Sequence, residues 1–111
     1  MGADGIKLLL VDRDVMTAME DEAHKLGLPI AHHVGVKETN AWDDIRLGTT
    51  SIEHWYGIPD AALDEGVQGF PPSYNYNNEV DRFRYAGHLW READPAVLDK
   101  VLDSMVTHHV A

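Results

Sequence analysis

The stretch SIEHWYG at residues 51–57 ends a short apolar run on a histidine, His54, which two aromatic residues and a glycine follow. Two earlier stretches share this layout. GIKLLLV at 5–11 carries Lys7 within an apolar run, and LPIAHHV at 28–34 contains a histidine pair near its end. Short continuous apolar runs bounded by turn residues are typical of strands in a parallel sheet. The three stretches therefore predict three parallel strands, each with a polar side chain that can do chemistry.

The spacing between these side chains leaves room for one helix in each connection. Lys7 and His33 are 26 residues apart, and His33 and His54 are 21 apart. A β-α-β crossover consumes roughly 30 residues or fewer. Apolar positions at helical spacing predict the two helices over about 15–26 and 39–47. The polar side chains thus recur once per β-α unit, and we expect them to converge at one end of the sheet.

The second half of the chain has a different texture. A short helical turn and a long loop rich in Gly, Pro and Tyr are followed by a predicted helix over 79–91. A last helix is predicted from Asp94, with that residue as N-cap and a proline in the first helical position. We expect a single domain over 1–111, with a β-α-β-α-β core over 1–57 and a loop and helices over 58–111.

Composition excludes several classes of function. Nine Lys and Arg against 19 Asp and Glu give a formal charge of −10, which argues against binding to nucleic acid. The absence of cysteine excludes disulfides and thiolate metal sites, and it fits a cytoplasmic protein. No apolar run approaches the roughly 18–20 residues that a transmembrane helix needs, so no membrane partner is expected.

Taken singly, the candidate site residues have ordinary explanations. A lone lysine in a strand, such as Lys7, more often extends its ammonium group into solvent. His32 and His33 are adjacent in a predicted strand and therefore point to opposite faces, so at most one of them can face a shared site. Either, like His54, can be a structural histidine. Together, imidazoles from successive strand ends are the usual ligands of first-row divalent metals.

At this point the three stretches carry a resemblance. GIK at 5–7, LPIAHH at 28–33 and SIEH at 51–54 resemble strands four, five and six of the amidohydrolase superfamily, in its imidazolonepropionase- and prolidase-like branch. The resemblance implies an α/β fold that is part of a (β/α)₈ TIM barrel, with about three consecutive β-α units and a C-terminal helical segment. It also implies a metal-dependent hydrolase that acts on an amide, cyclic amide or related C–N bond through a metal-activated water.

The resemblance assigns roles residue by residue. Lys7 matches the bridging ligand, often carbamylated, and His33 and His54 match the two histidines of the second metal site. One or two divalent ions, most often Zn²⁺, are implied for a complete enzyme. The family's His-x-His motif of strand one and its strand-eight aspartate are absent, so no catalytic base is identified. The chain resembles the centre of a barrel, and its expected partner is the rest of the barrel or another copy of itself.

The long loop and the helix after it supply candidates for contact with a small-molecule or dipeptide-like substrate. These are Tyr56, Tyr74, Tyr76, Arg82 and Arg84, since an arginine can hold a carboxylate by two parallel hydrogen bonds. The ordinary alternative pairs the arginines with acidic neighbours on a solvated helix. A different class of function also stays open: a non-catalytic α/β binding or interaction module that self-associates.

Overall fold

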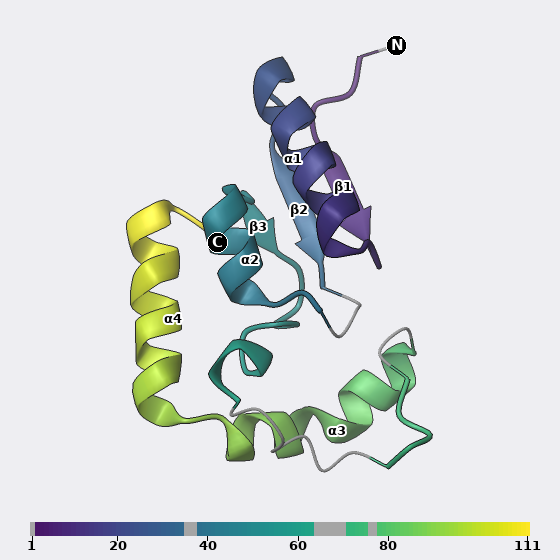
Figure 1. Ribbon diagram of the computed structural model, residues 1–111, viewed down its shortest axis with the longest axis vertical. Helices are drawn as coiled ribbons and strands as arrows, with labels where there is room; N and C mark the ends of the chain where they lie inside the picture. The colour runs from purple at the N-terminus through teal and green to yellow at the C-terminus, as the bar shows by residue number, and fades with distance from the viewer. Residues whose placement is uncertain (1, 35–37, 64–70, 76–77) are drawn as a thin grey trace.

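Three short parallel strands form the sheet, in the order β1-β2-β3 (Figure 1). They are β1 (Ile6–Leu9), β2 (Ile30–His33) and β3 (Ser51–Ile52). Lys7 lies beside Ala31, and Ala31 lies beside Ser51. The computed structural model describes residues 2–34, 38–63, 71–75 and 78–111. All three strands lie within the stretches predicted from the sequence.

Four α-helices and one 3₁₀ turn are the other regular elements among the described residues. They are α1 (Arg13–Leu26), α2 (Ala41–Leu47), η1 (Asp60–Ala62), α3 (Glu79–Glu92) and α4 (Pro95–His108). The predicted helices agree with these bounds to within about two residues, which is the usual uncertainty of helix ends.

Local capping chemistry explains where these helices begin and end. The Asp94 side chain accepts hydrogen bonds from the first turn of α4, as predicted for an N-cap before proline. Asn40 caps α2 in a capping box with Asp43. Gly27 and Gly48 end α1 and α2 with φ values of 69° and 84°, in the left-handed region where glycine has no Cβ penalty.

Helices α1 and α2 both pack on one face of the sheet, as right-handed crossovers between neighbouring parallel strands require. Leu8 and Ile30 of the sheet form one buried apolar cluster with Met16 and Ala23 of α1. A second cluster joins α2, η1 and α4 around Ala41, Ile45, Ala61, Val101, Met105 and Val110. The sheet itself is thus covered mainly on one side, and α4 extends the helical layer beyond β3 (Figure 1).

The predicted partial (β/α)₈ barrel is wrong. The described residues form a small α/β domain with three parallel strands and four α-helices. Among the described residues after β3, two α-helices follow in succession without a strand between them, and α4 packs back on α2 and η1. The outer edge of β3 is occupied by Ala111, whose N–H donates to Thr50 O and whose carbonyl accepts from Ile52 N. Strand–helix alternation is common to every parallel α/β architecture, so it predicted the class without predicting a barrel.

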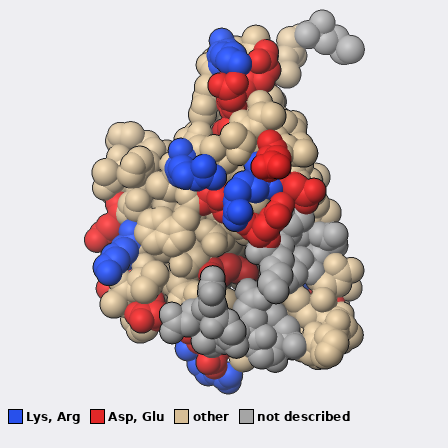
Figure 2. Space-filling model, viewed as in Figure 1, with Lys and Arg blue, Asp and Glu red and all other residues tan. Residues whose placement is uncertain are grey.

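The surface carries its acidic charge in mixed clusters. Figure 2 shows acidic side chains interleaved with lysines and arginines on the face that α1 and α2 present. Ion pairs there join Arg13 to Asp43 at 2.9 Å and Lys25 to Asp21 at 2.6 Å. Across the ranges that the structure describes, no helix combines the length and the apolar character needed to cross a bilayer.

Candidate metal centre

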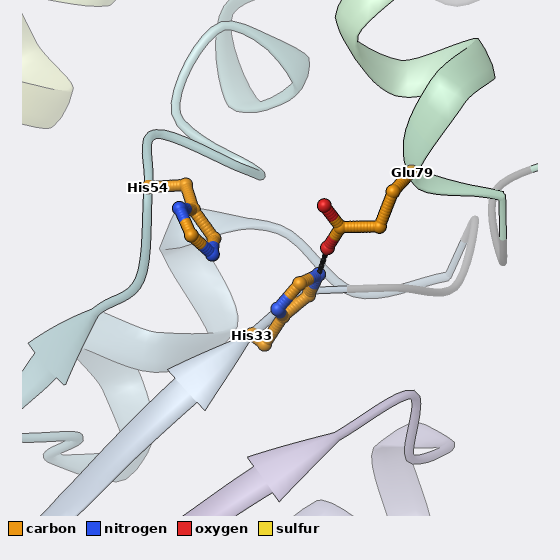
Figure 3. A group of neighbouring side chains, drawn as sticks. All are labelled: His33, His54 and Glu79. Atoms are coloured by element: carbon orange, nitrogen blue, oxygen red, sulfur yellow. Dashed lines mark ion pairs between the residues drawn. The ribbon is translucent and has the colours of Figure 1, made fainter.

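Three side chains that can bind a metal meet at the carboxyl end of the sheet. His33 ends β2, His54 follows β3, and Glu79 begins α3 (Figure 3). One ligand atom from each lies within 4.8 Å of the other two. His33 Nε2 and Glu79 Oε1 are 3.1 Å apart. His33 is buried, whereas His54 and Glu79 are exposed, so the group opens to solvent on one side.

The turn after β3 places His54 with a backbone conformation that few residues adopt. His54 has φ of 68°, in the left-handed region that disfavours a side chain with a Cβ. Gly57, three residues later, has φ of 85°. A Cβ added to Gly57 would lie only 2.9 Å from Val34 Cγ2. The Gly57 carbonyl accepts from Ala41 N and Ala61 N, which ties the turn to α2 and η1. Left-handed residues other than glycine are often found at functional sites.

Tyr56 forms the inner wall of the group. Its side chain is fully buried, and its ring centroid lies 4.8 Å from that of His33 and 5.2 Å from that of His54. The Tyr56 hydroxyl donates to Glu79 Oε2 at 3.4 Å. The buried guanidinium of Arg82 lies 4.2 Å from the centre of the Tyr56 ring, in cation–π geometry. One tyrosine therefore contacts all three members of the group.

Burial sets the electrostatics of this wall. Desolvation lowers the pKa of His33, and the negative charge of Glu79 opposes only part of that effect. A lowered pKa keeps the imidazole neutral near pH 7, which is the form that binds metals. Burial also raises the pKa of Tyr56, with a further contribution from Glu79, so the phenol stays protonated and able to donate.

One pair of ligand atoms in the group is spaced much as it would be around a divalent ion. Ligand nitrogen and oxygen atoms at about 2.0–2.2 Å from an ion are about 2.8–3.1 Å from each other in octahedral coordination and about 3.3–3.6 Å in tetrahedral coordination. The 3.1 Å separation of His33 Nε2 and Glu79 Oε1, which is also an ion-pair distance, lies at the upper end of the octahedral range. Two histidines and one glutamate are a recurrent ligand set of catalytic zinc, and the 2-His-1-carboxylate set also suits non-haem iron.

Lys7 lies on the same face of the sheet as His33, but its ammonium group has another partner. Lys7 Nζ is 3.0 Å from Glu53 Oε2, and this ion pair is partly exposed. Glu53 reaches Lys7 across Ala31, the small residue that lies next to Lys7 in β2. The lysine lowers the pKa of Glu53 by hydrogen bonding and by charge. The structure therefore brings His33 and His54 together and directs Lys7 to a carboxylate outside the group.

The residues predicted to contact substrate fall into two sets. Tyr56 and Arg82 belong to the wall of the metal group, but both are fully buried. Arg84 is exposed and pairs with Asp81 at 3.5 Å, as the ordinary alternative predicted. Tyr74 packs edge-on against Tyr85 with ring centroids 5.2 Å apart, and Tyr76 lies outside the described residues.

Glu79 was not predicted as a ligand. The sequence placed it at the start of a helix, where acidic residues are common because they interact favourably with the helix dipole. Because acidic residues are so common at helix starts, the position of Glu79 in the sequence does not indicate a metal ligand. Only the fold shows that this helix start faces the tips of β2 and β3 (Figure 3).

On the opposite face of β2, His32 takes part in a buried polar network. His32 Nδ1 lies 2.7 Å from Asp44 Oδ1, and both side chains are fully buried. The Thr49 hydroxyl lies 3.0 Å from the same Asp44 oxygen and 2.6 Å from Glu20 Oε1. The adjacent histidines thus point to opposite faces, as the strand period predicts. His32 and Asp44 join β2 to α2 beneath the metal group.

Comparison of the chain with family models, with curated proteins and with solved structures gave no match.

Proposed function

We propose that the protein binds one divalent metal ion, zinc by preference, through His33, His54 and Glu79. The observation that carries this proposal is the meeting of three ligand atoms within 4.8 Å at the tips of three different elements. His33 is buried and has a lowered pKa, so little free energy is needed to remove a competing proton. The open side formed by His54 and Glu79 leaves room for water or substrate.

We further propose that this site supports hydrolysis of an amide or related C–N bond. A divalent ion bound by three protein ligands lowers the pKa of a coordinated water toward about 7 and polarises a carbonyl group. The chain's own residues hold the ligands in place: the fold fixes His33 on β2, and the start of α3 presents Glu79. The choice of C–N bonds rests on the resemblance of the three strand segments to amidohydrolases.

The metal site is tested first, without reference to activity. Isothermal titration of metal-free protein with Zn²⁺ should show one ion per chain. His54→Ala should weaken binding by roughly 100-fold, because the total binding free energy is shared among only a few ligands. Glu79→Ala should have a comparable effect. His108→Ala, which removes a histidine at the C-terminal end of α4, is the matched control and should bind like the unchanged protein. Equal affinity in all four proteins would refute the site.

Activity is tested second. The zinc-loaded protein is offered N-acyl amino acids, cyclic amides and dipeptides, and release of amine is followed. Turnover should disappear in His54→Ala and persist in His108→Ala. Zinc binding without turnover on any of the three substrate classes would leave a metal-binding protein and overturn the hydrolase proposal.

One observation favours a second candidate, a self-associating binding module. The sheet face opposite α1 leaves the Leu9 side chain 53% exposed and carries a groove of about 400 Å³, lined in part by Lys7, Ala31 and Ser51. Parallel sheets are usually covered on both faces. Light scattering after size-exclusion chromatography decides this candidate: a dimer that Leu9→Glu converts to a monomer supports it, and a monomer at all concentrations contradicts it.

A further inference from the structure

Tyr56 contacts every member of the proposed metal group, although it cannot itself reach solvent. Its hydroxyl donates to Glu79 Oε2, and its ring packs against the imidazoles of His33 and His54. The side chain is fully buried in a turn held by Gly57. A residue with these contacts is poorly placed to bind substrate, but well placed to hold ligands.

The hydrogen bond to Glu79 separates the roles of the two carboxylate oxygens. Oε1 is the atom that lies 3.1 Å from His33 Nε2, and Oε2 is the atom that accepts from Tyr56. At 3.4 Å this bond is longer than an ordinary O–H···O bond, so it restricts the rotation of the carboxylate about its last bond without locking it. Oε1 is thereby presented toward the imidazoles. Hydrogen bonds to ligating groups commonly orient them and tune the affinity of a metal site.

The ring of Tyr56 constrains the two imidazoles in the same way. Tyr56 meets His33 edge-to-face with an interplanar angle of 62° and meets His54 in a tilted arrangement at 46°. Arg82 lies over the Tyr56 ring, which fixes the ring in place. The plane of the buried His33 imidazole is thus set by packing before any ion arrives, which lowers the entropy lost on binding.

We propose that Tyr56 is the positioning residue of the metal centre: its hydroxyl orients Glu79, and its ring orients His33 and His54. This inference rests on the proposed metal site and adds a residue that touches no metal. The two functions of the side chain are separable, because Tyr56→Phe removes the hydroxyl and keeps the ring.

The experiment is a double-mutant cycle on zinc affinity. Tyr56→Phe should weaken zinc binding roughly tenfold, at the lower end of the effect of losing a hydrogen bond to a metal ligand. In the Glu79→Ala background the same substitution should change affinity little, because the hydroxyl then has no carboxylate to orient. Tyr85→Phe, which removes a hydroxyl elsewhere in α3, is the control and should leave affinity unchanged. Circular dichroism checks that each variant is folded.

The absorption spectrum of bound Co²⁺ tests the role of Tyr56 directly, because it would not change if Tyr56 only supported the fold. The visible absorption of bound Co²⁺ depends on coordination geometry, so Tyr56→Phe should alter the spectrum while Tyr85→Phe leaves it unchanged.

The failures are distinguishable. If the unchanged protein binds no zinc, the metal site itself is refuted. If it binds zinc and Tyr56→Phe binds equally well with the same cobalt spectrum, only the role of Tyr56 is refuted. An equal loss in the presence and absence of Glu79 would also overturn the proposal, because Tyr56 would then act through the fold and not through that ligand.

Discussion

The two faces of β2 place adjacent histidines in opposite environments. On the helix-covered face, His32 is fully buried and held by Asp44 of α2. On the open face, His33 meets the exposed residues His54 and Glu79, which come from the turn after β3 and the start of α3. On the helix-covered face, the polar side chains bond to each other and join β2 to α2. On the open face, the imidazole and carboxylate atoms remain available to bind a metal. One residue step along a strand therefore separates a structural histidine from a candidate metal ligand.

The largest effect on stability is expected on the covered face. Asp44→Ala leaves the buried His32 ring nitrogen and the Thr49 hydroxyl without their shared acceptor. The free energy of unfolding should fall by about 3 kcal/mol, as is typical when one partner of a buried polar pair is removed. Urea denaturation measures it. Asp103→Ala, on the exposed side of α4, is the control, and a loss below about 1 kcal/mol in Asp44→Ala would show that the network contributes little.

On the open face, a substitution at His54 should be able to raise stability while it removes metal binding. His54 has a positive φ of 68°, so His54→Gly should be more stable than His54→Ala by about 1 kcal/mol, because glycine has no Cβ penalty there. Both variants should lose the zinc affinity. Thermal unfolding of the metal-free proteins compares them, and equal stability would mean that the turn carries no strain to relieve.

A smaller, pH-dependent effect on stability is expected at Glu20, which bonds to Thr49 at the end of the buried polar network. Burial raises the pKa of Glu20, opposed by its bond to Thr49 and by His24 and His32; the nearby Asp44 adds to the rise. A raised folded-state pKa means that the stabilisation from this group is complete below its ordinary value of 4.5 and is lost as pH rises through the folded-state pKa.

Glu20→Gln imitates the protonated form at every pH. Relative to the unchanged protein, this variant should therefore gain stability as pH rises above about 4.5. Urea midpoints between pH 4 and 8 measure the difference. A constant difference across that range would show that Glu20 titrates alike in the folded and unfolded chain.

The comparison also shows what the sequence can reveal. Capping by Asp94 and the opposite orientation of His32 and His33 follow from local backbone rules, and both were predicted. Two features depend on the path of the whole chain and were not. Glu79 becomes a candidate ligand only because α3 begins beside the strand tips, and the barrel was wrong because α4 packs back on α2 and η1 and Ala111 pairs with β3. Local sequence patterns do not show which distant segments will pack against each other.

The smallest effect on stability and zinc affinity is expected at Lys7. The resemblance made Lys7 a metal ligand, but in the fold it lies outside the metal group. Its ammonium group pairs with Glu53 on the open face, in a partly exposed ion pair of a kind that adds little stability. Lys7→Met should leave both the urea midpoint and the zinc affinity unchanged. Lys25→Met, which breaks an exposed ion pair on α1, is the matched control.

A carbamylated bridging lysine would behave differently in two measurable ways. Added bicarbonate would raise the zinc stoichiometry or affinity of the unchanged protein, and Lys7→Met would abolish that response. We expect neither, because Lys7 Nζ donates to Glu53, whereas carbamylation would place a negatively charged carboxylate beside Glu53, which would repel it. A bicarbonate response lost in Lys7→Met would move Lys7 into the metal centre and make the open face a two-metal site.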